Sequence, residues 1–237
     1  MKESLQKRAQ EMGISLSERQ LNQFVRYYEL LVGWNEKMNL TAITEWDDVL
    51  SKHFLDSLSS AHLLRDRFGE SFSLIDVGTG AGFPGIPLKI LFPEMRLLLL
   101  DSLQKRVGFL QTVCDELGFE NVECLHARAE EQAHKEGFRE CFDVATARAV
   151  SALPVLAEYL SGYVIPGGIC LAYKGPGWQE EYAAEESIFG RLQLRLSGSV
   201  PVEIPGTDLH HELMIFHKEA KLSLKYPRSQ SKIKSRR

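Results

Sequence analysis

Cysteine is scarce in this 237-residue sequence: it has four cysteines, which stand singly and at uneven intervals. Cys114, Cys124, Cys141 and Cys170 lie mostly among apolar neighbours, which favours reduced core thiols over disulfide bonds or a zinc site. The seven histidines include no His-Glu-x-x-His motif and no ligand spacing with cysteine. We therefore expect no bound metal.

Long apolar runs are also missing. No stretch approaches the ~18 to 20 consecutive apolar residues of a membrane span, and the first eight residues lack the apolar centre of a secretory signal. We therefore expect a cytoplasmic protein with no membrane contact. Hydrophobic residues make up 44% and charged residues 25% of the chain, enough for a sizeable core, which excludes disordered and fibrous classes.

The charge is unevenly distributed. Residues 218–237 contain eight basic residues and one acidic residue, a net charge of +7, which leaves −11 on the remainder of the chain. A basic arm can approach nucleic-acid phosphates, which an acidic body repels. A solvated, flexible tail is the simpler interpretation of the same composition, and both stay open.

Residues 1–70 have the pattern of a helical extension. Ser17 and Gln20 form a capping box at the start of one helix. The apolar face of that helix follows a helical period, at Leu21, Phe24, Val25, Tyr28, Leu31 and Val32. A second helix, from Thr44, should carry Leu50, Phe54, Leu58 and Ala61 inward and leave His53 and Asp56 as neighbours on another face.

From residue 71 to residue 217, short apolar runs alternate with helical stretches. Seven runs are strand candidates: 72–77, 96–100, 121–125, 142–146, 168–173, 192–200 and 212–217. Alternating strands and helices predict an α/β fold with a doubly wound, mainly parallel sheet of about seven strands. The last two runs flank the loop 201–206 and should form an antiparallel hairpin at the sheet edge.

The first strand-to-helix turn, Asp76-Val-Gly78-Thr-Gly80-Ala-Gly82, is the expected ligand site, because ligands bind beyond the carboxyl ends of parallel strands. Its continuation also fits the dinucleotide pattern Gly-x-Gly-x-x-Gly. A carboxylate at Asp76 would repel a pyrophosphate but favour the ammonium and sulfonium of S-adenosylmethionine. Asp101, after the second strand, could hold the ribose of either ligand.

The segment Arg128-Ala129-Glu130 follows the third strand and could meet an adenine ring and its amino group. These features favour S-adenosylmethionine. A nicotinamide or flavin cofactor, or a glycine turn that only closes the strand-helix junction, remains an alternative.

Several motifs resemble the RsmG (GidB) family of 16S ribosomal RNA guanine-N7 methyltransferases, from about residue 20 to Arg228. They are Asn39–Ile43, His53–Leu58, Asp76–Pro87, Asp101–Leu110, Arg148–Val150 and Lys174-Gly175. The resemblance implies a class I methyltransferase (Rossmann-like) fold and cofactor contacts at Gly78, Phe83, Asp101, Ser102, Ala129, Glu130 and Arg148. It also implies 16S ribosomal RNA as the partner. The segment after Tyr226-Pro-Arg228 departs from the family pattern.

The acceptor can also be approached by exclusion. The position after the fourth strand reads Thr146-Ala-Arg-Ala149, which is not the Asp/Asn-Pro-Pro-aromatic motif of amino-group methyltransferases. Neither Cys141 nor Cys170 stands where a cytosine-C5 nucleophile would. Direct transfer to a lone pair remains, and guanine N7 suits it because it loses no proton. Catalysis would then rest on proximity and need no general base.

Four side chains have open roles. Arg148 is the candidate catalytic residue, beside the transfer point and holding the cofactor carboxylate or guanine O6; a sheet-edge ion pair is the alternative. Lys174 could meet an RNA phosphate or be a plain loop lysine. His53 and Asp56 could be an acid-base pair, although a positioning pair is the preferred interpretation.

Four functions stay open. They are an RNA methyltransferase, a small-molecule or protein methyltransferase, a nicotinamide-dependent oxidoreductase, and an assembly factor that uses the cofactor only for folding. The acidic body favours a structured ribonucleoprotein substrate, the small ribosomal subunit, and a monomer is the default expectation.

Overall fold

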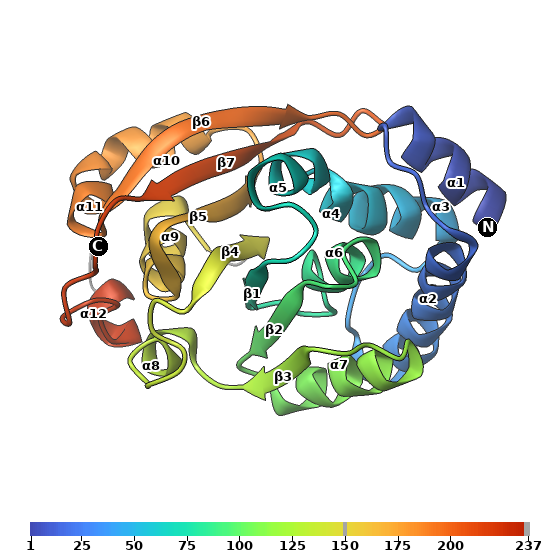
Figure 1. The fold of residues 1–237 in the computed structure, drawn as a ribbon, viewed down its shortest axis with the longest axis horizontal. Helices are drawn as coiled ribbons and strands as arrows, with labels where there is room; N and C mark the ends of the chain where they lie inside the picture. Colours follow the sequence, from blue (N-terminus) through green and yellow to red (C-terminus); the bar gives the residue numbers. More distant parts are fainter. Residues whose placement is uncertain (149–150, 235–237) are drawn as a thin grey trace.

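The computed structural model describes residues 1–148 and 151–234. Within these residues seven strands form one sheet in the order β3-β2-β1-β4-β5-β7-β6 (Figure 1). The first five strands are parallel, whereas β7 runs antiparallel to both β5 and β6. The strands are β1 (Ser73–Val77), β2 (Arg96–Asp101), β3 (Val122–His126), β4 (Phe142–Arg148), β5 (Val164–Lys174), β6 (Leu194–Val202) and β7 (His211–Lys218).

This sheet confirms the predicted doubly wound, mainly parallel α/β fold with an antiparallel C-terminal hairpin. All seven predicted runs became strands, with bounds that moved by a few residues. β1 and β4 lie side by side at the centre, which is the point where the order of strands along the chain reverses. Ligands of such sheets bind beyond this point, at the carboxyl ends of the strands.

Apolar residues alternate between the two faces of the sheet. In β2, Leu97 and Leu99 join the core on one face, and Leu98 and Leu100 join the core on the other. The first core packs against α6 (Gly85–Leu91), α7 (Gln104–Glu116) and the N-terminal helices; the second packs against α9 (Leu153–Ser161) and α11 (Glu186–Arg191). Burial on both faces explains why the strands are apolar runs without alternating polarity.

The N-terminal helices α1 (Lys2–Glu11) and α2 (Glu18–Met38) cover the first face. The predicted capping box is present, with Ser17 and Gln20 each bonding the other's backbone NH. Leu21, Phe24 and Leu31 are buried as expected, but Tyr27 takes the inward position given to Tyr28. Residues 1–70 share one continuous core with the sheet, and the domain boundary at residue 70 stays a prediction.

The next segment begins at Trp46 and widens into a π-helical turn. Its parts are α3 (Trp46–Val49), η1 (Leu50–Leu55), α4 (Asp56–Leu58) and α5 (Ala61–Phe68). Leu50, Phe54, Leu58 and Ala61 are fully buried, as predicted. The wider turn changes the rotation from one residue to the next, and such turns recur at functional sites.

The C-terminal hairpin spans the molecule. Its strands follow α10 (Trp178–Ala184) and α11, and its tip lies beside α1 (Figure 1). Arg8 of α1 donates two hydrogen bonds to the Pro205 carbonyl, at 3.1 and 2.5 Å. These hydrogen bonds tie the loop of the hairpin to the first helix of the chain.

The basic C-terminal segment differs from the expected flexible tail. Lys218 is the last residue of β7 and is fully buried, and Leu222, Tyr226 and Ile233 are buried against the second core. Arg228 pairs with buried Glu158 at 2.7 Å. After it comes α12 (Gln230–Lys234). Composition alone suggested solvation, but widely spaced apolar anchors dock this segment through residue 234.

Candidate functional site

The glycine turn joins β1 to α6. The short helix α8 (Ala129–Gln132) follows β3. Gly78, Gly80 and Gly82 all have positive φ, a region where side chains are disfavoured. A Cβ on Gly82 would lie 2.7 Å from Tyr27 Oη and would also overlap Ile86. The N-terminal extension therefore packs directly on the turn, because the Tyr27 hydroxyl also donates to the Ala81 carbonyl.

Asp76 lies beneath this turn and is fully buried. One carboxylate oxygen, Oδ2, accepts hydrogen bonds from Thr79 Oγ1 at 2.7 Å and from the Gly85 NH at 2.8 Å. The other, Oδ1, is buried with no hydrogen-bond partner in the described residues. Burial raises the pKa of Asp76 to about 6. A cation bound above the turn would favour its ionised form, whereas a pyrophosphate would not.

Asp101 ends β2 and fixes the same turn from the other side. Its carboxylate accepts from the Gly80 NH at 3.0 Å and the Leu103 NH at 2.9 Å, and Arg106 lies 3.5 Å away. Asp76 therefore holds the turn at Thr79 and Gly85, and Asp101 holds it at Gly80. Both carboxylates are at most 2% exposed, so they act on a ligand here chiefly through the shape and charge of the turn.

A cavity of about 250 Å³, called here the turn cavity, opens beside Gly78. Of the residues predicted to contact a cofactor, Gly78, Ser102, Ala129 and Glu130 line it. It runs past the ends of β1, β2 and β3. Val77 and Arg128, which belong to the predicted turn and the predicted adenine segment, also line it. No sequence motif pointed to the remaining lining residues, Leu100, Ala127, Ser151, Val155, Tyr159 and Gln230.

The other predicted contacts lie outside the turn cavity. Asp76, Gly80 and Asp101 form the turn itself, and Phe83 is 6% exposed behind it. The His53 ring stacks on the Phe83 ring with centroids 4.5 Å apart, and the Arg148 guanidinium lies 5.1 Å from the Phe83 centroid. The turn thus supports Arg148 from below by a cation–π contact.

Arg148, at the end of β4, joins the turn to the N-terminal helices. Its guanidinium donates to Asp56 Oδ2 at 2.6 Å, to the Lys52 carbonyl at 3.0 Å and to His53 Nδ1 at 3.2 Å. Asp56 is 3% exposed and also binds His211 of β7. The ion pair considered as an alternative for Arg148 is therefore present. The rest of the motif, Ala149 and Val150, lies outside the described residues.

His53 is neutral in this arrangement. Nδ1 of His53 lies 3.2 Å from Arg148 Nη2, which can only donate, and 3.0 Å from the Lys52 carbonyl, which can only accept. Its Nε2 lies 2.9 Å from Thr41 Oγ1. Burial and the Arg148 charge lower the pKa of His53 to about 4. A histidine whose two nitrogens are both engaged cannot serve as a free base, which agrees with a positioning role.

A second hollow of about 260 Å³, the charged pocket, lies at the carboxyl ends of β4 and β5. It is lined by Asp56, Arg148, Ser151, Leu156, Tyr173, Lys174, Gly175 and His211. Lys174 pairs with Glu181 at 2.8 Å. Ser151 lines both the charged pocket and the turn cavity, so the two hollows adjoin. Sequence reasoning singled out most of these charged side chains but not Tyr173 or His211.

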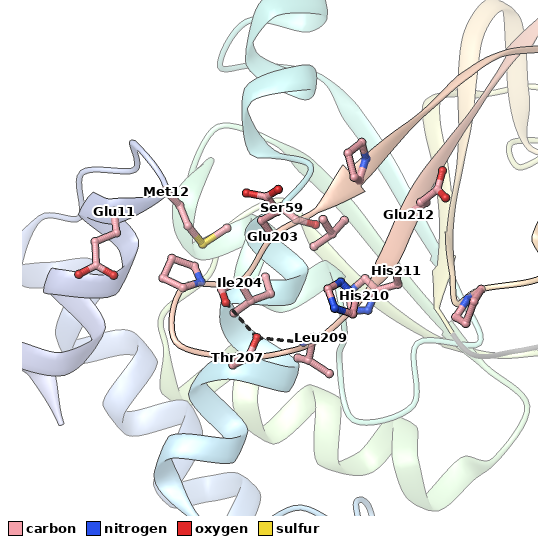
Figure 2. Close-up of a pocket in the computed structure, with 14 residues that line it drawn as sticks. Glu11, Met12, Ser59, Glu203, Ile204, Thr207, Leu209, His210, His211 and Glu212 are labelled. Atoms are coloured by element: carbon pink, nitrogen blue, oxygen red, sulfur yellow. Dashed lines mark hydrogen bonds between the residues drawn. The ribbon is translucent and has the colours of Figure 1, made fainter.

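A larger groove of about 850 Å³ lies on the far side of His211, between α1 and the hairpin tip. In Figure 2, the Met12 side chain at the end of α1 points toward the loop that carries Glu203, Ile204 and His210. Three carboxylates, those of Glu11, Glu203 and Glu212, line the groove. This charge is unsuited to RNA phosphates or to a phosphate-bearing cofactor, so the groove is a less suitable ligand site than the turn cavity.

Comparison with known proteins identifies the family. The family model described as "rRNA small subunit methyltransferase G" (GidB) matches residues 20–201. The "Ribosomal RNA small subunit methyltransferase G" of Geobacillus thermodenitrificans is 48% identical over 92% of this chain and 91% of its own. The protein of the same name from Alkaliphilus metalliredigens is 46% identical, with the same shares covered. The chain belongs to this family.

Solved structures agree on the fold. The fibrillarin pre-rRNA processing protein of Methanococcus jannaschii superposes with a TM-score of 0.50 and 15% identity, covering 64% of this chain and 68% of that one. Family membership confirms the predicted resemblance and the enzyme class, a methyltransferase.

Two further findings concern the described residues alone. In residues 1–148 and 151–234, no group of three His, Cys, Asp or Glu side chains is arranged to hold a metal ion. In the same ranges, no helix combines the length and apolar character needed to cross a membrane.

Proposed function

We propose that this member of the family transfers the methyl group of S-adenosylmethionine to N7 of a guanine in 16S ribosomal RNA of the small ribosomal subunit. The family match supports ribosomal RNA as the acceptor. The observation that carries the rest is the adjoining of the turn cavity and the charged pocket at Ser151, which gives a cofactor and a base neighbouring sites.

The residues of the turn cavity fit this cofactor. S-adenosylmethionine supplies an electrophilic methyl group on a positively charged sulfur and carries no phosphate. The cavity contains the nearly buried carboxylate of Glu130, and Asp76 lies under the turn with one unpartnered oxygen. Ser102 and the main chain of Ala129 complete the lining near the ribose and adenine. A cationic, phosphate-free ligand suits this donor and acceptor set best.

The charged pocket fits a guanine base. Arg148 and Lys174 offer donors for O6, and Asp56 offers an acceptor for the N1 and N2 hydrogens. N7 already has a lone pair and loses no proton on methylation, so no general base is required. Neutral His53, engaged on both nitrogens, is consistent with that chemistry. Catalysis would come from holding the two reactants in line, a contribution of about 7 to 11 kcal/mol at best.

Arg148 is the proposed catalytic residue because it lines the charged pocket together with Ser151, the residue that this pocket shares with the turn cavity. Its ion pair with Asp56 holds the guanidinium over Phe83 before the ligands arrive. From there it can reach either the cofactor carboxylate or guanine O6 with a change of rotamer. Asp56 would keep its second partner, His211, during that movement.

Other parts of the proposal follow from the substrate. A ribosomal acceptor would place the reaction in the cytoplasm, and the −11 charge of residues 1–217 favours an assembled subunit, whose basic proteins and cations can offset it. A monomer, the absence of a metal and the domain boundaries stay predictions.

The test is methyl transfer from labelled S-adenosylmethionine to small subunits isolated from cells that lack the enzyme. The RNA is then digested and the nucleosides are separated. We expect label in 7-methylguanosine and none after denaturation of the protein. Label in another nucleoside would refute the acceptor atom. Tight cofactor binding without any transfer would instead favour an assembly factor.

A further inference from the structure

The C-terminal strap, residues 226–234, lies against the turn cavity. Its end, α12, places Gln230 among the residues that line this cavity, together with Glu130 and Tyr159. Gln230 also lines a second crevice of about 460 Å³, which it shares with Arg128 and Glu130. Arg128, Glu130 and Gln230 form the wall between the turn cavity and this crevice. The C-terminal strap therefore closes one end of the proposed cofactor site. Along the chain it lies more than 70 residues after the strands that build the rest of the site.

The strap is held by buried contacts before it reaches the cavity. The carboxylate of Glu158, which is fully buried, accepts from the Arg228 backbone NH at 2.7 Å and from its guanidinium at 2.9 and 2.7 Å. Arg139 donates to the Tyr226 carbonyl at 3.0 Å, and His134 contacts the Pro227 carbonyl at 2.8 Å. Charge-assisted bonds of this kind are about twice as strong as neutral ones, so the position of residue 228 is fixed.

The amide of Gln230 is oriented by neighbours in the cavity wall. Its Oε1 accepts from Arg128 Nη1 at 3.4 Å, and its side chain also hydrogen-bonds Tyr159 of α9. The contact with Arg128 is long, and Gln230 is only half-buried. The amide can therefore exchange a weak partner for a ligand without leaving a buried group unsatisfied.

The end of the cavity beside Gln230 is the one that suits an adenine ring. Gly78 and Ser102 lie at the other side, after β1 and β2, whereas Ala129 and Glu130 follow β3. Val155 and Tyr159 of α9 give this end an apolar wall. A primary amide offers one acceptor and two donors, a match for the amino group and ring nitrogens of adenine.

We propose that Gln230 is a cofactor-binding residue, which hydrogen-bonds the adenine edge of S-adenosylmethionine and lets the C-terminal strap close the cofactor site. This inference rests on the proposed function, because it presumes that the turn cavity holds this cofactor. It assigns a role to a part of the chain where the motif pattern of the family ends. Cofactor binding should in turn order the strap.

Isothermal titration of S-adenosylhomocysteine and of adenosine against the full chain tests the inference. In Gln230→Ala both ligands should bind about three- to tenfold more weakly, and by the same factor, because the lost bond is to the half that they share. A chain that ends at Ser229 should lose at least as much. Ser231→Ala is the matched control: Ser231 lies on the same helix and lines the outer crevice only, so its affinities should stay within twofold.

The outcomes separate the two proposals. Normal affinity of Gln230→Ala for both ligands would refute the role of Gln230 and leave the cofactor site intact. A loss for S-adenosylhomocysteine alone would refute the adenine contact. If the unaltered chain bound neither ligand, the proposed function itself would fail. As an independent readout, S-adenosylhomocysteine should slow trypsin cleavage after Lys232 in the unaltered chain and not in Gln230→Ala.

Discussion

The turn cavity and the charged pocket adjoin, yet they are built from different materials. The turn cavity is lined by residues at the carboxyl ends of β1, β2 and β3, among them the small residues Gly78, Ser102 and Ala129, and by residues of α9 and α12. The charged pocket gathers Asp56, Arg148, Lys174 and His211 from α4, β4, β5 and β7. The turn cavity depends on the glycines that shape its turn, whereas the charged pocket depends on each charge having its partner.

Arg148→Ala should have the largest effect because Arg148 is the largely buried cation of the charged pocket, where the acceptor base is proposed to bind. We expect methyl transfer to small subunits to fall by about a hundredfold or more, as when a preorganised donor is removed from an active site. Arg148→Lys should recover part of the rate, since it keeps the charge but loses the planar fork. Transfer is measured with labelled cofactor.

The double variant with Asp56→Asn and Arg148→Ala controls for folding, because the single change leaves the buried Asp56 carboxylate with His211 alone. The double variant should melt close to the unaltered protein and remain inactive. Full activity in either variant would remove Arg148 from the mechanism.

Gly82→Ala tests whether the turn cavity depends on its backbone. The added Cβ would overlap Ile86 and lie 2.7 Å from Tyr27 Oη, at a φ of +101°. Overpacking of this kind costs about 1 to 3 kcal/mol, so the melting temperature should fall and cofactor affinity with it. Thermal unfolding and titration of S-adenosylhomocysteine measure the two effects.

Gly108→Ala is the matched control for that change. Gly108 lies in α7 with nothing within 4 Å of an added Cβ, so alanine should leave stability unchanged or raise it by up to about 1 kcal/mol. Equal melting temperatures for the two variants would contradict the close packing of Tyr27 on the turn.

The buried carboxyl group of Asp76 predicts that ligand affinity in the turn cavity, and not in the charged pocket, depends on pH. Its pKa of about 6 is raised by burial, so the protonated form dominates below that pH. A bound cation favours the ionised form, and S-adenosylmethionine should therefore bind about tenfold more weakly at pH 5 than at pH 7.5. Adenosine, which is uncharged, should show little change over this range. In Asp76→Asn the dependence should disappear for S-adenosylmethionine.

The raised pKa of Asp76 also makes the free energy of unfolding depend on pH. Between the unfolded pKa of 3.8 and the folded value of about 6, the native state binds the extra proton, so the Asp76 contribution falls as pH rises. His53 acts oppositely: its lowered pKa of about 4 makes stability fall as pH drops below 6.5. A pH dependence of S-adenosylmethionine binding that survives in Asp76→Asn would exclude Asp76 as its source.

Lys174→Met should have the smallest effect and should be limited to the charged pocket. Lys174 already pairs with Glu181, so its substitution should remove only one phosphate or base contact. Binding of small subunits should weaken by about threefold, and the slope of log affinity against log salt concentration should fall by about one. Affinity for S-adenosylhomocysteine should not change. Lys37→Met, at the exposed end of α2, is the control and should bind subunits normally. An effect on the cofactor would contradict the division between the two hollows.

The fold was largely predictable because its signals are local. The apolar runs gave all seven strands, and the capping box at Ser17 gave the start of α2. The turn with Gly78 and Gly80 was recognisable because positive φ strongly favours glycine. The π turn at 50–55 was not predicted, since nothing in its apolar spacing distinguishes it from a regular helix.

The site was predictable in part. Four of the expected cofactor contacts, Gly78, Ser102, Ala129 and Glu130, line one cavity because each follows a strand of the same parallel sheet. Tyr159 and Gln230 could not be expected there, because their sequence neighbourhoods carry no ligand motif. The docking of 218–234 was missed for a related reason: Leu222, Tyr226 and Ile233 are too widely spaced to give a periodic signal.

The sequence by itself determined the parallel sheet, the glycine turn and the family, since these depend on short-range spacing and backbone preference. Only the tertiary structure decided that Asp56, Arg148 and His211 meet in one pocket, and that the C-terminal strap closes another. Those contacts join residues 92, 155 and more than 100 positions apart. Their partners are selected by the packing of the whole chain, which no local pattern encodes.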